Sequence, residues 1–319
     1  MKESHEKGNI VEVVFNSATG AVRLKSNGGT LMPDWLEKAG VPRDYVKSIR
    51  ISSGKVYLPE DASGSENEDT DFKMFGGLQN VHTIDLRKFD TSRVTNMRAM
   101  FESCYNLKAL DLTGLDTSNV TDMSQMFRDC HALRELHLNS IDTSNVTKMS
   151  YMFGGCSSIE DIDTTNISTK NVNQMNSMFS GCASLKTLDL SRFDTAKATD
   201  MKYMFFDCLN LISLDISGFD MTNVTSTKFM FGGCAKLEAV DVKHFNTPKL
   251  TDMSWMFSRC HALQGLDMSS FNMSNVRDMS GVFYNCTHLK KVIMQPIIES
   301  KIQTVDMFGG CPANLQMQF

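Results

Sequence analysis

The decamer Thr121-Asp122-Met123-Ser124-Gln125-Met126-Phe127-Arg128-Asp129-Cys130 has a pattern that recurs along most of the chain. A Phe returns every 26 residues, at 75, 101, 127, 153, 179, 205, 231, 257 and 283, and once more at 308 after a step of 25. All nine cysteines lie three residues after one of these Phe residues. A fixed period of this size is typical of a solenoid, in which each repeat packs only against its neighbours.

Within the decamer, Met123, Met126, Phe127 and Cys130 are spaced i, i+3, i+4 and i+7. This spacing predicts a short helix with one buried face. Thr121 precedes that helix as its expected N-cap, and Asp122 would lie in its first turn, where the helix dipole favours a negative charge.

A second element follows each predicted helix. Leu107, Leu110 and Leu112 alternate with polar or small residues, which predicts a short strand buried on one side. The run 116–119, Asp-Thr-Ser-Asn, then favours a turn in which side chains bond their own backbone. One such unit buries too little apolar surface to fold alone, so we expect the copies to stack.

These elements predict an α/β solenoid of the leucine-rich-repeat type. We expect a right-handed arc of about nine to ten 26-residue rungs, with a parallel β-sheet on the concave face and short helices on the convex face. Residues 1–70 lack the repeat and are assigned to an N-terminal capping region of strands plus a short helix. Residues 71–295 hold the repeats, and residues 296–319 form an atypical last rung and C-terminal cap.

Composition excludes several classes of function. The chain has 319 residues, a net charge of −5 and scattered basic residues, so we expect no nucleic-acid partner. No apolar run approaches 18 residues, so we expect no membrane span, and the first residues lead into no signal-peptide core. The motifs G-x-S-x-G, H-E-x-x-H and the P-loop are absent, so we expect neither an enzyme nor a cofactor.

The cysteine ladder has two interpretations. Nine thiols would suggest disulfides or a metal site, but thiols one rung apart on the same face have poor disulfide geometry. A zinc site would need two ligands two to four residues apart and a convergent second pair, which the spacing does not offer. The favoured interpretation is therefore a column of buried, reduced cysteines.

An acidic column occupies the outward-facing strand position. Its members are Asp111, Asp163, Asp189, Asp215, Asp241 and Asp267, with Asp85 before them and His137 in the one interruption. Stacked like charges repel, so they need hydroxyls, water, a base or a cation nearby. The column is either a solvated ladder used for turn bonding or an acidic strip for a basic partner or weakly held calcium.

An aromatic column lies two residues after the first Met of the decamer. Its members are Tyr151, Tyr203, Phe229 and Trp255. Half-exposed aromatic residues at this spacing form either a binding stripe or a seal between neighbouring helices.

The runs Phe89–Met97 and Leu112–Met123 carry a family resemblance. They resemble the repeat of BspA-like leucine-rich surface proteins, whose units read "FDTSNVTDMSxMFxxC" and which also occur in mycoplasma lipoproteins. The resemblance covers about residues 46–311, and Val56–Glu60 is similar to the segment that enters the repeats in that family. It implies a cell-surface or secreted protein used in adhesion, with no catalytic residues to carry over.

The residues and the resemblance together predict a non-enzymatic binding module. We expect an exported, monomeric adhesin-type protein that recognises a protein or a glycan. The alternatives are an intracellular, cytoplasmic interaction scaffold or sensor of the same fold, which reduced thiols would favour, and a structural spacer without a ligand.

Overall fold

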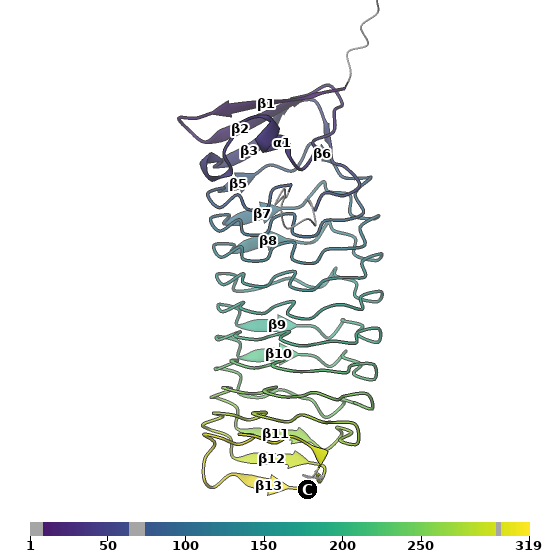
Figure 1. Cartoon of the computed structure of the whole chain (residues 1–319), viewed down its shortest axis with the longest axis vertical. Coiled ribbons are helices and arrows are strands. Elements are labelled where there is room, and N and C mark those ends of the chain that lie inside the picture. Colours follow the sequence, from purple (N-terminus) through teal and green to yellow (C-terminus); the bar gives the residue numbers. More distant parts are fainter. Residues whose placement is uncertain (1–8, 64–73, 298–300) are drawn as a thin grey trace, which may run out of the picture.

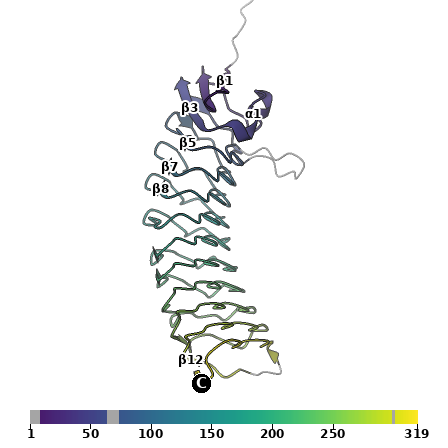
Figure 2. The same ribbon diagram turned by 90° about the vertical axis from the view of Figure 1, so that its left-hand side faces the viewer.

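The structure is a computed structural model that describes residues 9–63, 74–297 and 301–319. Over these residues the chain winds into a tall column of about 11 turns, and strands of successive turns pair in parallel (Figure 1). The column bends only gently (Figure 2). The solenoid predicted from the 26-residue period is therefore confirmed. The turns exceed the nine to ten expected because residues 48–63 already run as a turn of the stack.

A small mixed sheet covers the N-terminal end of the column. The elements here are β1 (Val11–Asn16), β2 (Ala21–Ser26), α1 (Trp35–Lys38), the 3₁₀ helix η1 (Arg43–Tyr45), β3 (Ser48–Ser53) and β4 (Val56–Tyr57). The hairpin β1–β2 is antiparallel, whereas β3 runs parallel both to β2 and to the first repeat strand, β5 (Thr83–Ile84). The N-terminal sheet is therefore continuous with the repeat stack.

The remaining strands are short and belong to the repeats. They are β6 (Phe89–Asp90), β7 (Ala109–Asp111), β8 (Glu135–His137), β9 (Thr187–Asp189), β10 (Ser213–Asp215), β11 (Gly265–Met268), β12 (Lys291–Met294) and β13 (Gln316–Gln318). Equivalent positions pair directly: Leu110 lies opposite Leu136, and Leu188 opposite Leu214. This register keeps each column of the sequence on one face of the molecule.

The core of the column is a stack of Phe rings. From Phe75 to Phe308, each ring lies parallel to the next, with centroids 5.1–5.9 Å apart and planes within 3–13° of each other. Every ring from Phe75 to Phe283 is fully buried. Burial of one such side chain contributes about 1.5–3 kcal/mol, so the column supplies a large share of the stability.

The expected convex-face helices are absent. Among the described residues, α1 is the sole α-helix, and the decamer 121–130 forms a chain of tight turns instead. Gln125 and Asp129 have φ values of 60° and 59°, in the left-handed region that a right-handed helix cannot contain. The predicted N-cap was also wrong: the Thr121 hydroxyl donates to the Thr95 carbonyl of the preceding rung.

The physical reason is that alternate amides of the decamer bond to the next rung. The N–H groups of residues 123, 125, 127 and 129 donate to carbonyls of residues 148, 150, 152 and 154 at 2.7–3.0 Å. The N–H groups between them, on Met126, Arg128 and Cys130, close local turns to the residue three positions earlier. We call this surface the turn face. Along residues 123–129 and their equivalents, the inter-rung N–H groups point toward the C-terminal end and the accepting carbonyls toward the N-terminal end. The Thr121 N–H, at the start of the decamer, is opposite and donates to the Thr95 carbonyl of the preceding rung.

Side chains cap the carbonyl end of this ladder. The first rung has no preceding repeat, yet the Trp35 indole N–H donates to the Met74 carbonyl (2.9 Å) and the Arg43 guanidinium donates to the Gly76 carbonyl (2.7 Å). These carbonyls occupy the positions that, in later rungs, accept from the preceding rung. The cationic Arg43 also matches the partial negative charge expected where carbonyls converge, as at a helix C-terminus.

The corner at residues 116–119 matches its prediction. The Asp116 carboxylate accepts a hydrogen bond from the Ser118 N–H (3.0 Å), as in an Asx turn. The buried Thr117 hydroxyl donates to the Asp142 carbonyl (2.9 Å) and accepts from the Asp142 N–H (2.7 Å). Polar columns at the corner therefore link one rung to the next.

Candidate functional site

The acidic column lies on the exposed face of the strands, which we call the strand face. Each of its six carboxylates accepts a hydrogen bond from the backbone N–H two residues later, at 2.9–3.1 Å. Asp111, Asp163 and Asp267 also accept a bond from the hydroxyl of that same residue, at 2.6–2.7 Å. The carboxylates thus fix the backbone turn after each strand.

In four of the carboxylates these bonds also favour the charged form. Hydrogen bonds from Thr113, Thr165 and Ser269 lower the pKa of Asp111, Asp163 and Asp267, and bonds from Ser191 do the same for Asp189. His137 lies beside Asp111 in strand register, and its proximity further lowers the pKa of that carboxyl. Over the described residues, no group of three or more His, Cys, Asp or Glu side chains is arranged to hold a metal ion.

Two hollows of different character open on the strand face. The first, of about 370 Å³, is lined by Asp161, Asp163, Asp189 and Asp215, with Arg192 as its one cationic side chain. We call it the acidic hollow. Its charges are concentrated over three adjacent rungs, which gives a field that favours cationic groups.

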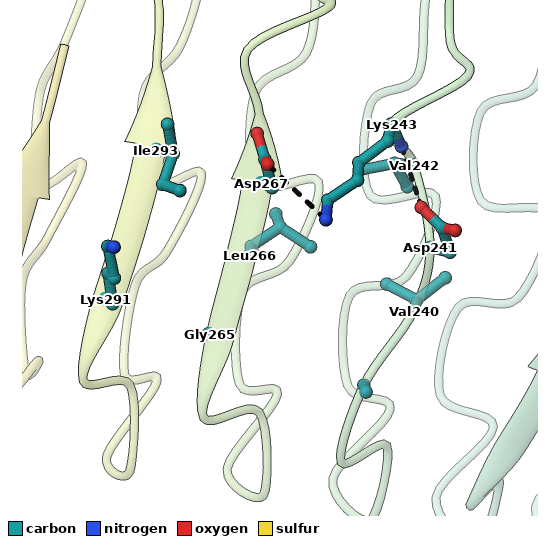
Figure 3. Close-up of a pocket in the computed structure, with 10 residues that line it drawn as sticks. Val240, Asp241, Val242, Lys243, Gly265, Leu266, Asp267, Lys291 and Ile293 are labelled. Atoms are coloured by element: carbon teal, nitrogen blue, oxygen red, sulfur yellow. Dashed lines mark hydrogen bonds and ion pairs between the residues drawn. The ribbon is translucent and has the colours of Figure 1, made fainter.

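The second hollow, of about 360 Å³, has an apolar floor. Figure 3 shows Leu266 between strand β12, which carries Lys291 and Ile293, and the rung that carries Val240 and Lys243. The Lys243 ammonium lies 3.7 Å from the Asp267 carboxylate. We call this the apolar hollow. The hollow exists because small residues precede the floor residues on the exposed side of the strands: Ala239 precedes Val240, and Gly265 precedes Leu266.

The sequence marked Lys243 as a possible partner of the acidic column, and it does lie beside Asp267, but sequence reasoning missed the apolar hollow and Lys291. The acidic column ends where Ile293 replaces Asp, and the small residues Ala239 and Gly265 occupy adjacent rungs. Those two departures from the repeat were the available signal. The predicted site residues Asp241 and Asp267 do line this hollow.

The aromatic column lies on the turn face, apart from both hollows. The ring of Tyr203 stacks on Phe229 (5.2 Å between centroids), and Phe229 stacks on Trp255 (5.8 Å). Trp255 lies against Gly281, where an added Cβ would come within 2.4 Å of the indole. Tyr151 stands apart from the three, and the Arg128 guanidinium covers its ring at 5.1 Å. Neighbouring groups therefore cover much of the ring faces.

The thiols are reduced, and eight of the nine are fully buried. Each Sγ–H donates to the carbonyl of a Phe in the preceding rung at 3.0–3.2 Å, an interaction that the sequence did not predict. Burial raises the pKa of Cys104, Cys208 and Cys286 to about 12, which suppresses the nucleophilic thiolate. The cysteine column therefore contributes packing and hydrogen bonds.

Comparison with known families gives one match that covers most of the chain. A family model described as "Mycoplasma protein of unknown function, DUF285" matches residues 70–168, 156–240 and 208–318. No curated protein matches the sequence. Within the described residues, no helix has the length and apolar character to cross a bilayer.

Three solved structures resemble the chain at 14% sequence identity. A leucine-rich cell surface protein from Faecalibacterium prausnitzii has a TM-score of 0.37, with 92% of this chain and 96% of that chain covered. A leucine-rich repeat protein from Eubacterium ventriosum has a TM-score of 0.40, with 94% and 92% covered. One from Bacteroides ovatus has a TM-score of 0.29, with 97% of each chain covered.

Proposed function

The chain belongs to the DUF285 family of mycoplasma proteins, and we propose that it is a non-enzymatic binding module whose strand face receives a protein partner. The observation that carries the proposal is the pair of hollows on one face, one acidic and one apolar. Both open along the same stack of strands, so one extended partner surface would reach them together.

The chemistry of the hollows favours a protein over a glycan. A basic side chain complements Asp163, Asp189 and Asp215, while an aliphatic side chain fits over Val240 and Leu266. Sugar recognition commonly uses an exposed aromatic face, and the rings of the aromatic column are covered by one another, by Arg128 and by Gly281. The aromatic column is better suited to sealing the seams between rungs.

We further propose that the module acts outside the cell as an adhesin-type protein. The resemblance of its repeat to BspA-like surface proteins supports this location. The cytoplasmic scaffold is the alternative, and the buried, reduced thiols are compatible with it.

A binding panel with matched variants tests the proposal. Purified host-surface proteins, matrix proteins, a cytosolic extract and a glycan array are each offered to the immobilised chain, with calcium and with a chelator. A partner found there is measured again with D163N/D189N/D215N and with D116N/D142N/D194N. The second variant is the control, because it removes three charges from Asp residues at the corner.

We expect the strand-face variant to lose about tenfold or more in affinity and the corner variant to bind as the parent does. Both variants keep an acceptor oxygen: Asn272, a natural Asn in the corner column, accepts the Ser274 N–H at 3.0 Å. Equal losses in both variants, or binding to glycans alone, would contradict the proposal. A partner found only in the cytosolic extract would favour the intracellular scaffold.

A further inference from the structure

The last rung leaves the turn-face ladder open. In rungs before it, N–H groups at alternate residues donate to the following rung, as Met279, Gly281, Phe283 and Asn285 do to carbonyls of residues 303, 305, 307 and 309. The equivalent N–H groups of the last rung belong to Thr304, Asp306, Phe308 and Gly310. None of the hydrogen bonds found among the described residues starts from these four amides.

Apolar groups accompany this row of donors. Phe308 stacks on Phe283 with centroids 5.4 Å apart, and no further ring of the described chain lies on its other side. Val305 and Phe319 are 69% and 70% exposed, and Cys311 is the one cysteine that is not fully buried. Within the described residues, strand β13 pairs with β12 alone, so its other edge has no partner strand there. We call this surface, formed by residues 304–311 and 316–319, the amide end.

The row of donors defines what can pair with it. Four N–H groups on alternate residues lie along a line, so they suit a row of carbonyl oxygens rather than one small anion that needs converging donors. Such a row is partially positive, but the exposed carboxylate of Asp306 lies within it and Lys291 belongs to the strand face, so side-chain charge does not select the partner. A flat apolar group would extend the Phe stack beyond Phe308.

Neither end of a second folded copy of this chain offers such a row of free carbonyl oxygens. Two amide ends in contact would bring N–H groups against N–H groups. At the opposite end of a second copy, the Met74 and Gly76 carbonyls already accept from Trp35 and Arg43.

We propose that the amide end docks an extended, aromatic-containing segment of another polypeptide. Its backbone lies along the last rung, its alternate carbonyls accept from Thr304, Asp306, Phe308 and Gly310, and its aromatic ring stacks on Phe308. This site is distinct from the strand face and does not depend on the function proposed for it.

The decamer of the repeat itself supplies a probe with the required geometry. In the stack, the carbonyls of residues 122, 124, 126 and 128 accept from the preceding rung in this manner. The probe is a synthetic peptide of residues 121–130, blocked at both ends, with Ser in place of Cys130. The control peptide also carries Ala in place of Phe127. Binding to the full chain is followed by NMR, together with hydrogen exchange of individual amides.

We expect saturable binding of the probe that slows exchange at Thr304, Asp306, Phe308 and Gly310 and leaves residues 74–77 unchanged. The control peptide, or the variant Phe308→Leu with the intact probe, should bind about three- to tenfold more weakly. Phe308→Leu keeps an apolar side chain at a half-buried position, so the fold should survive. The proposal is overturned if the probe does not saturate, if protection appears elsewhere, or if the four amides of the free protein are already protected in a self-associated form.

Discussion

The two ends of the column end the same ladder of hydrogen bonds in opposite ways. At the N-terminal end, Trp35 and Arg43 cover the first carbonyls, and Phe75 is buried against Trp35, Phe89 and Phe101. At the amide end, four N–H groups and one side of Phe308 have no such cover. The difference shows that a polar ladder needs capping donors at one end and capping acceptors at the other. The described residues supply only the capping donors.

Thiol reactivity should separate the two ends most sharply. Cys104, in the first complete rung, is fully buried, whereas Cys311 is only partly buried. We expect a thiol reagent to label Cys311 directly and Cys104 only on unfolding, at least about a thousandfold more slowly. Mass spectrometry of the labelled peptides measures both rates. Equal labelling rates would mean that the N-terminal cap does not protect the rung of Cys104.

The same Phe substitution should cost different amounts at the two ends. Phe75→Ala removes a ring enclosed on several sides, so we expect it to lower the free energy of unfolding by about 3–5 kcal/mol. Phe308→Ala should cost roughly half of that, because its ring packs against one neighbouring ring. Phe179→Ala, in the middle, should match the larger value. Denaturant unfolding measures all three, and equal losses at both ends would remove the distinction.

Removal of the capping donor tests the N-terminal end alone. Trp35→Phe keeps an aromatic ring but leaves the Met74 carbonyl without its partner, which should cost about 1–3 kcal/mol. Trp255→Phe is the matched control, since the indole N–H of Trp255 makes no hydrogen bond within the described chain. A similar loss in both variants would show that ring size, not the hydrogen bond, accounts for the effect.

Acid should weaken the N-terminal end through Asp90. The hydrogen bond from Lys55, with help from Ser92, lowers the pKa of Asp90 from 3.8 to about 2. Because the folded pKa is the lower one, the carboxylate stabilises the fold above about pH 4, and this contribution disappears as the pH falls toward 2. Melting temperatures from pH 5 to pH 2 should fall less steeply for Lys55→Met than for the parent. Parallel curves would contradict the assignment.

The smallest change is expected in the middle of the column, away from both ends. Replacement of Asp189, Asp215 and Asp241 by Asn keeps an acceptor for each turn and relieves repulsion between adjacent rungs. The melting temperature should stay the same or rise slightly. A clear loss would show that the charge itself, rather than the acceptor oxygen, holds these turns.

The repeat made the solenoid, its buried Phe and Cys columns and the Asp116 corner predictable, because each depends on residues within one period. The helix prediction failed because the spacing of apolar residues is shared by a helix and by this chain of turns. A contrary signal was present: Gly155, Gly181 and Gly233 recur two residues after the Phe, with φ values of 72–77°. Asp129, Asp207 and Asn285 fill that position in three other rungs, and Asp and Asn tolerate the same conformation better than most residues. Ser103 and Arg259 also adopt it, so the signal is not uniform.

The capping hydrogen bonds of Trp35 and Arg43 and the two hollows were not predictable in the same way. Trp35 and Arg43 reach acceptors 39 and 33 residues away, and neither belongs to a repeat. The apolar hollow depends on Gly265 and Ile293, which depart from the repeat, so the period carries no information about it. The predicted acidic and aromatic columns lie on different faces and stay candidates for binding.

The uniform direction of the turn-face ladder has a consequence for how such a chain can change. Every interior rung offers the same donors on one side and the same acceptors on the other, so a 26-residue unit can be duplicated or lost in register without leaving an unpaired group. Variation in length is therefore structurally neutral within the column. The two ends of the stack, by contrast, cannot be exchanged. Any binding property located at one end is therefore kept when the column gains or loses interior units.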